Sequence, residues 1–120
     1  MKFCWVTLHV DNMEESLHFY HGLLGLPVDS RRGGGDLEIA MLGDPGMPKV
    51  ELLCEKGEKI TDRQTGISVG FEVESLDQAV EFLKQQGIPV VSGPFSPNPH
   101  IRFLFVRDPN GIEVQLVENR

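Results

Sequence analysis

The chain has 120 residues, 40% of them hydrophobic, and its 11 basic and 18 acidic residues give a formal net charge of -7 at pH 7. This length and composition fit one compact domain, which we predict over residues 1–120. The acidic balance and the lack of a basic stripe argue against a nucleic-acid-binding protein. No apolar run approaches 18 residues and the N-terminus lacks a signal-peptide pattern, so we expect neither a membrane span nor secretion.

The two cysteines, Cys4 and Cys54, both lie in apolar stretches. Two cysteines are too few for a disulfide framework. We therefore predict that they are reduced thiols in the core of a cytoplasmic protein.

The strongest pattern in the sequence is an internal repeat. Residues 10–28 are followed by a similar segment at residues 73–90, and the positions after the repeat also correspond. The offset is 63 for Val10 and Val73, 62 for Leu26 and Ile88, and 64 for Glu51 and Gln115. A long period that occurs only twice indicates a duplicated module rather than a repeat array. We predict module 1 over about residues 1–57, module 2 over about residues 64–120, and a shared cleft about a pseudo-two-fold axis.

The first element is a strand over about Lys2–Val10, in which Trp5, Thr7 and His9 share the face opposite to the apolar residues. A helix follows, with Asn12 as the N-cap and Glu15 three residues later. Its stripe of Met13, Leu17 and Tyr20 predicts a core face, and Gly25 is expected to end it in the left-handed conformation. Three strands are then predicted: about Leu26–Ser30, Leu37–Leu42 and Pro48–Cys54.

The second module repeats these elements after a polar bridge, Glu55–Thr65. Its helix begins with the Ser75 and Gln78 capping pair and ends at Gly87. Its strands are predicted over about Gly66–Val73, Ile88–Val91, Ile101–Arg107 and Ile112–Val117. Each half therefore has the order βαβββ. The predicted fold class is α+β, with two such modules forming a curved eight-stranded sheet around a cleft.

Two sequence patterns carry a resemblance to a known family. The first half contains V-D-x-M-x-x-S-x-x-F-Y-x-x-x-L-G, and the second half contains D-P-N-G-x-x-V-x-L. With the doubled βαβββ unit, these patterns make the whole chain resemble the vicinal oxygen chelate superfamily. Its members include glyoxalase I, methylmalonyl-CoA epimerase, extradiol dioxygenases, fosfomycin-resistance enzymes and bleomycin-binding proteins. The fold hosts several chemistries, so the resemblance implies a fold and not a reaction.

The resemblance also implies where a metal would bind. In metal-using members, four residues from the first and last strands of the two modules hold one divalent ion. Those positions fall here on Trp5, Glu51, Ser68 and Gln115. Indole offers no lone pair, and a neutral hydroxyl and an amide carbonyl are weak ligands, so Glu51 alone is a strong one. We predict no tightly bound metal and no cofactor, although a shifted site with His9 and Glu72 stays conceivable.

Glu51 is the candidate general base. In resembling isomerases a glutamate at such a position ligates the metal and can move a substrate proton. The alternative is structural, because donors on Trp5, Ser68 and Gln115 would satisfy a half-buried carboxylate where an ion is absent. Both alternatives stay open.

The remaining candidates have comparable alternatives. Trp5 either stacks on a planar ligand or fills the space of the metal, and Thr7, His9 and Glu72 are predicted to line the cleft. Arg31 and Arg32 either clamp an anion or form a solvated turn. The segment Ser92–His100 resembles a lid, although its prolines also stiffen it.

We predict a glyoxalase-like protein that binds a small organic molecule and lacks the usual metal site. It would act by sequestration, as in resistance proteins, or as a metal-independent lyase or isomerase. The alternative is a metal-dependent lactoylglutathione-lyase-like or epimerase-like enzyme with an unusual ligand set. A third possibility is a vestigial cleft in a protein that acts through protein contacts. The resemblance implies a homodimer.

Overall fold

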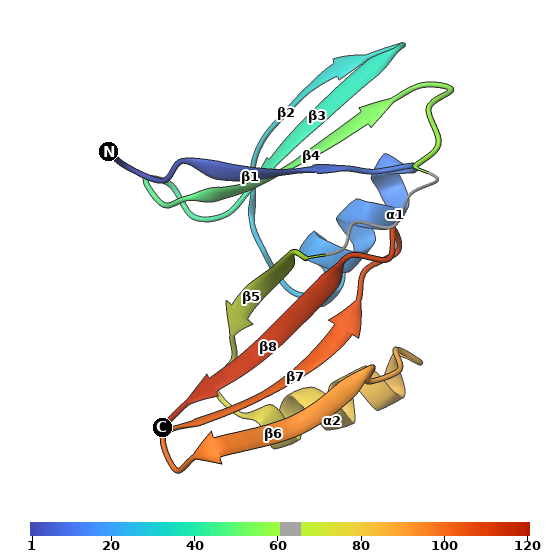
Figure 1. Ribbon diagram of the computed structural model, residues 1–120. Coiled ribbons are helices and arrows are strands. Elements are labelled where there is room, and N and C mark those ends of the chain that lie inside the picture. The colour runs from blue at the N-terminus through green and yellow to red at the C-terminus, as the bar shows by residue number, and fades with distance from the viewer. Residues whose placement is uncertain (61–65) are drawn as a thin grey trace. The chain divides into compact units, whose positions relative to one another are not determined.

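The computed structural model of the protein describes residues 1–60 and 66–120. The chain divides into two compact units, Met1–Arg63 (unit 1) and Gln64–Arg120 (unit 2). Each unit contains one four-stranded sheet (Figure 1). Residues 61–65 of the predicted bridge lie outside the described residues.

Unit 1 contains four strands and one helical segment. Its sheet has the order β1-β4-β3-β2, in which β1 is parallel to β4 and the other neighbours are antiparallel. The helical segment joins β1 to β2. The elements are β1 (Trp5–His9), α1 (Met13–Leu17), the π-helix η1 (His18–Leu23), β2 (Val28–Gly34), β3 (Leu37–Leu42) and β4 (Lys49–Glu55).

Unit 2 repeats this topology. Its sheet has the order β5-β8-β7-β6, with β5 parallel to β8 and the other neighbours antiparallel. Helix α2 joins β5 to β6 (Figure 1). The elements are β5 (Ser68–Glu72), α2 (Leu76–Gln85), β6 (Ser92–Asn98), β7 (Ile101–Arg107) and β8 (Glu113–Asn119).

The predicted α+β class and the βαβββ order of both halves are confirmed. The eight strands are hydrogen-bonded as two sheets of four. The predicted bounds of β3 and β7 match the structure, whereas β1 and β5 are shorter than predicted. The prediction that both halves form one domain stays a prediction.

One strand prediction is wrong. The strand expected over Ile88–Val91 is instead β6, Ser92–Asn98, so most of the predicted lid is part of the sheet. The segment Ser92–His100 resembled an irregular loop, and proline cannot donate a ladder hydrogen bond. However, β6 is an edge strand, where proline is tolerated, and its pairing with β7 shifts register between matched positions.

The predicted helix ends are confirmed in both units. The Asn12 side chain accepts a hydrogen bond from the Glu15 backbone N–H at 2.9 Å. The Ser75 hydroxyl accepts one from the Gln78 N–H at 3.2 Å. Both helical segments are followed by a glycine with positive φ, 80° at Gly25 and 70° at Gly87. These are N-caps and left-handed helix ends of the kind the sequence indicates.

The π-helix explains why the repeat offset falls from 63 to 62 across the helix. The Leu24 N–H donates to the carbonyl of Phe19, five residues earlier. At the corresponding place in unit 2, the Gln86 N–H donates to the carbonyl of Phe82, four residues earlier. A π turn accommodates one extra residue within a helix. Unit 1 therefore absorbs its additional residue inside the helix and not in the sheet.

The core of each unit lies on one face of its sheet. In unit 1 the buried face of β1, β3 and β4 packs with the apolar stripe of the helical segment, whose Tyr20 is fully buried. The predicted core role of Met13 and Leu17 is confirmed. In unit 2 the buried face packs against α2 through Leu76 and Leu83. The buried sheet residues are Leu8, Ala40, Leu42, Val50 and Leu52 in unit 1, and Leu104, Val106, Val114 and Leu116 in unit 2.

The prediction that both cysteines are core thiols is wrong. Both thiols are free, but Cys4 is exposed and Cys54 is half-buried. Cys4 precedes β1, so the alternation of buried side chains along that strand does not extend to it.

Candidate ligand-binding faces and family membership

The open face of the unit 1 sheet carries the predicted site residues of module 1. Trp5 and His9 on β1 are exposed and Thr7 is half-buried, whereas Leu8 between them is buried. The predicted alternation along this strand is therefore confirmed. Because β1 is parallel to β4 with Thr7 opposite Glu51, the Glu51 side chain lies on the same open face.

The Glu51 carboxylate is held by its neighbour on β1. The Thr7 hydroxyl donates a hydrogen bond to Glu51 Oε1 at 2.7 Å, and the pair is partly buried. Sequence reasoning placed Thr7 in the cleft and expected Trp5 as a donor to Glu51. The register of β1 with β4 determines which side chain donates to Glu51, because Trp5 lies opposite Lys49 and Thr7 lies opposite Glu51. A repeat in sequence predicts the strands but not this register.

The corresponding face of unit 2 carries the other predicted residues. Gly70 lies opposite Gln115, which is the equivalent of Thr7 opposite Glu51. A Cβ atom at Gly70 would lie 3.4 Å from Gln115 Oε1, so the amide lies beside the glycine. Ser68, two residues before Gly70, is exposed. The two modules therefore present a hydroxyl–carboxylate pair in unit 1 and a glycine–amide pair in unit 2.

His9 and Glu72 are both exposed, and each belongs to a different unit. His9 lies opposite Leu53 on β4. Glu72 Oε1 accepts a hydrogen bond from Asn119 Nδ2 at 2.6 Å. A shifted metal site that uses both residues stays an alternative to the predicted lack of a tightly bound metal.

Sequence reasoning missed an aromatic group on the open face of unit 2. Phe103 and Phe105 on β7 alternate with the fully buried Leu104 and Val106, so their rings lie on the face opposite to the core. Phe95 on β6 approaches Phe103 with 5.5 Å between ring centroids, and Phe103 approaches Phe105 at 5.9 Å. The sequence did contain a signal for this group. The Phe-x-Phe spacing on the predicted strand Ile101–Arg107 places both rings on one face.

Arg31 does not lie in the predicted solvated turn, because it is part of β2. Its guanidinium forms ion pairs with Glu14 at 2.5 Å and with Glu38 at 3.0 Å. The hydrogen bonds that Arg31 donates to these two carboxylates, the one to Glu14 first, raise the pKa of Arg31. The Arg31 guanidinium therefore pairs with two carboxylates of unit 1, which argues against its role as a clamp for an anion.

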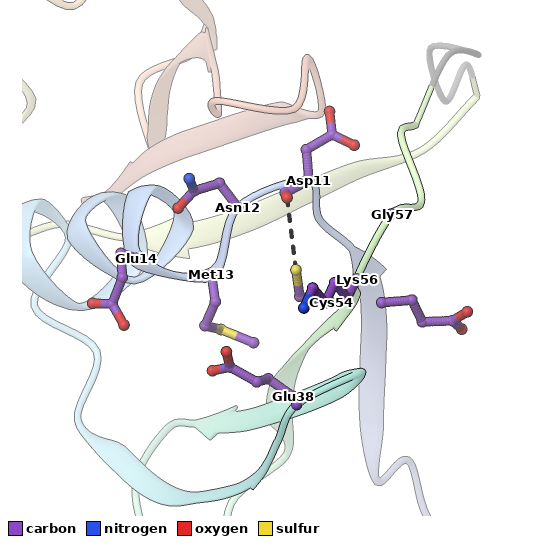
Figure 2. A pocket seen from close by; sticks show the side chains of 10 residues that line it. Asp11, Asn12, Met13, Glu14, Glu38, Cys54, Lys56 and Gly57 are labelled. Carbon is purple, nitrogen blue, oxygen red and sulfur yellow. Dashed lines mark hydrogen bonds between the residues drawn. The ribbon is translucent and has the colours of Figure 1, made fainter.

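Unit 1 also contains an open pocket of about 540 Å³ between the start of α1 and the ends of β3 and β4 (Figure 2). The thiol of Cys54 lies 3.6 Å from the Asp11 carbonyl at its edge. The charged residues of its lining are acidic apart from Lys56, and no sequence motif indicated this pocket. The lining residues are Asp11, Asn12, Met13, Glu14, Gly35, Glu38, Cys54, Glu55, Lys56 and Gly57.

The residues at the four positions implied for a metal do not fit a divalent transition ion. Glu51 is the sole carboxylate, and one of its oxygens already accepts the Thr7 hydrogen bond. Trp5, Ser68 and Gln115 supply an indole without a lone pair, a neutral hydroxyl and an amide. Within residues 1–60 and 66–120, no group of three or more His, Cys, Asp or Glu side chains is arranged to hold a metal ion. The same described segments contain no helix long and apolar enough to cross a membrane.

Comparison with known proteins agrees with the topology. The chain is 27% identical over 128 residues to a lactoylglutathione lyase of Neisseria meningitidis serogroup A, covering 100% of this chain and 92% of that protein. Its fold matches the trypanothione-dependent glyoxalase I of Leishmania major with a TM-score of 0.85 and 19% identity, over 98% of this chain and 86% of that one.

A second solved structure of the same fold is TnmS3, an antibiotic binding protein from a Streptomyces species. Its TM-score is 0.74 at 17% identity, over 100% of this chain and 97% of that one. The model of the glyoxalase/bleomycin resistance protein/dioxygenase superfamily matches residues 2–116. With nearly the whole chain matched, the protein belongs to the glyoxalase/bleomycin resistance protein/dioxygenase superfamily.

Proposed function

We propose that this protein binds a small organic molecule on the open faces of its sheets and does so without the family's usual metal ion. The observation that carries the proposal is the donor set at the ligand positions. Glu51 accepts a hydrogen bond from Thr7, and the other three metal-ligand positions of the family hold Trp5, Ser68 and Gln115. Family membership supports small-molecule binding, and the similar fold of the antibiotic binding protein from Streptomyces supports sequestration.

Two functions of the protein toward the bound molecule fit this proposal. In a sequestration protein, Glu51 is a polar contact whose hydrogen bond to Thr7 satisfies a half-buried carboxylate. In a metal-independent lyase or isomerase, the free lone pairs of the same carboxylate would take a proton from the substrate, and Thr7 would hold the carboxylate in position. A cytoplasmic homodimer is part of the same proposal.

A second candidate function is a metal-dependent lactoylglutathione lyase. The observation that favours it is the 27% identity to the Neisseria lactoylglutathione lyase over the whole chain. This candidate requires ligands other than the four positions discussed above.

Metal analysis of the purified protein separates the two functions. We expect less than stoichiometric zinc, nickel, manganese and iron, and a melting temperature that EDTA does not change. Reconstitution with each of these ions should leave the protein inactive toward the hemithioacetal of methylglyoxal and glutathione. A stoichiometric metal whose removal abolishes lyase activity would establish the second function and contradict the first.

A thermal-shift screen of small organic molecules tests the binding itself, because a ligand at 100 times its Kd stabilises the folded state by about 2.7 kcal/mol. Glu51→Gln is the variant for any molecule found, and Glu81→Gln is its control, since Glu81 is exposed on α2 and lies in neither sheet. Loss of turnover with retained binding in Glu51→Gln indicates a general base. Unchanged turnover excludes that role.

A further inference from the structure

The open face of unit 2 is divided into an aromatic half and a polar half. One cross-strand row runs from Glu72 on β5 through Val117 on β8 and Phe103 on β7 to Phe95 on β6. The next row runs from Gly70 through Gln115 and Phe105 to Ser92. Rings therefore occupy β6 and β7, whereas β5 and β8 carry Glu72, Gly70 and Gln115, with Val117 between the carboxylate and the rings.

The aromatic half is built by a close approach of β6 to β7. Gly93 has a φ of 91°, and a Cβ atom there would lie 2.9 Å from the Phe103 carbonyl oxygen and 3.1 Å from the Phe95 ring. Only glycine permits this approach without strain. The approach brings the Phe95 ring, which is 45% exposed, to 5.5 Å from Phe103.

The polar half carries a negative charge beside the rings. Glu72 accepts a hydrogen bond from the Asn119 amide, which is neutral and leaves the carboxylate charge in place. The second carboxylate of this face, Glu113, lies opposite Arg107 at the other end of the strands. Adjacent strands are about 4.8 Å apart, so the Glu72 and Phe103 backbones lie about 10 Å from each other.

From this arrangement we propose that unit 2 binds a planar aromatic cation, which stacks on Phe103 and Phe95 and directs its positive end toward Glu72. Aromatic faces attract both planar rings and cations, and a nearby carboxylate adds charge complementarity. This inference rests on the proposed small-molecule function and names its ligand class.

The probes are chosen as a matched set. 9-Aminoacridine is a three-ring planar cation, 9-anthracenecarboxylate is a three-ring planar anion, and spermidine is a cation without rings. Binding of the full-length protein is measured by probe fluorescence and by thermal shift. We expect 9-aminoacridine to bind at least about tenfold more tightly than either of the other two. An equal or higher affinity for the anion, or for spermidine, overturns the proposal.

Variants then locate the site. Phe103→Leu keeps an apolar side chain but removes the ring, and we expect it to weaken 9-aminoacridine binding by about 3- to 10-fold. Phe82→Leu is the control, because Phe82 is 39% exposed on α2, away from this face. If Phe103→Leu does not fold, Phe95→Leu at the more exposed ring is used instead. Equal affinities of the face variant and the control overturn the proposal.

The charge is tested separately. Glu72→Gln should weaken 9-aminoacridine binding by about 3- to 10-fold and leave 9-anthracenecarboxylate binding unchanged or tighter. Glu81→Gln, at an exposed position on α2, controls for the change in net charge. If other small molecules stabilise the protein but planar cations do not, this inference fails and the proposed function stands. If no small molecule stabilises it, both fail.

Discussion

The Thr7–Glu51 hydrogen bond is the residue-scale feature on which the site argument depends. A carboxylate that is half-buried needs donors, and the 2.7 Å hydroxyl contact supplies one from the adjacent strand. The same backbone positions in unit 2 are Gly70 and Gln115, where glycine has no hydroxyl to donate and the amide carries no charge. The change of side chain therefore gives the two equivalent sites different chemistry on the same backbone.

Replacing Thr7 tests this account. Thr7→Val keeps the shape of the side chain but leaves Glu51 Oε1 without the hydroxyl, so we expect a loss of about 1–2 kcal/mol in the free energy of unfolding. Thr7→Ser retains the hydroxyl and should lose less than half of that amount. Urea denaturation measures both. A negligible loss in Thr7→Val, or a larger loss in Thr7→Ser than in Thr7→Val, would show that the hydrogen bond does not carry the effect.

At the scale of elements, edge strand β6 shows what sequence patterns could not supply. The long irregular segment Ser92–His100 suggested a lid that its prolines stiffen, whereas in the structure Gly93 lies close against β7. Local sequence indicates where the backbone cannot donate a hydrogen bond. It does not indicate that the segment lies at a sheet edge, where donors are not required.

Gly93→Ala tests the importance of this approach. We expect it to lower the free energy of unfolding by more than about 2 kcal/mol, because a positive φ and a Cβ contact of 2.9 Å with a backbone oxygen both oppose alanine. Gly87→Ala is the matched control, since its φ is 70° but its Cβ would meet nothing within 4 Å. We expect about 1–2 kcal/mol there. Similar losses in both variants would contradict the role of the close contact.

The start of α2 depends on a buried carboxylate from β8. Glu118 Oε1 accepts a hydrogen bond from the Leu76 N–H at 2.9 Å, and Oε2 accepts one from Arg120 Nε at 2.7 Å. The Leu76 hydrogen bond, followed by the Arg120 hydrogen bond, lowers the pKa of Glu118 from its ordinary value near 4.5. The folded state therefore favours the ionised carboxylate more than the unfolded chain does.

Lowering the pH should weaken this contribution. Because the folded pKa lies below the unfolded one, the stability is fully present above about pH 4.5 and is lost as pH falls through the folded pKa. Glu118→Gln should lower stability at pH 7 and flatten its decline between pH 5 and pH 3 (about the range in which glutamate titrates). Denaturant titrations at several pH values measure this, with exposed Glu81→Gln as control. A decline as steep as in the unmodified protein would exclude Glu118 as a contributor.

For the whole molecule, the repeat in the sequence predicted the class, the order of elements and the face of β1 that carries Trp5 and His9. It did so because hydrophobic alternation and capping are local patterns. The donor to Glu51 and the ring contact between Phe95 and Phe103 depend on strand register and on a bulged edge, which are set by pairing between distant segments.

The assembly of chains is a further prediction at this scale. By its family resemblance we expect a homodimer, with a mass near twice 13.4 kDa by light scattering. The mass should not change when ligand is added or EDTA is present. A stable monomer at micromolar concentration would contradict this prediction.

The π-helix has a consequence for how the chain accommodates changes in length. The additional amino acid of unit 1 widens one helical turn, and the strands on either side keep the same order in the sheet as in unit 2. An inserted residue is thus accommodated within the helix and does not alter the order of the strands. A single alanine inserted between Gln85 and Gln86 should likewise widen the final turn of α2, and the sheet it covers should remain intact.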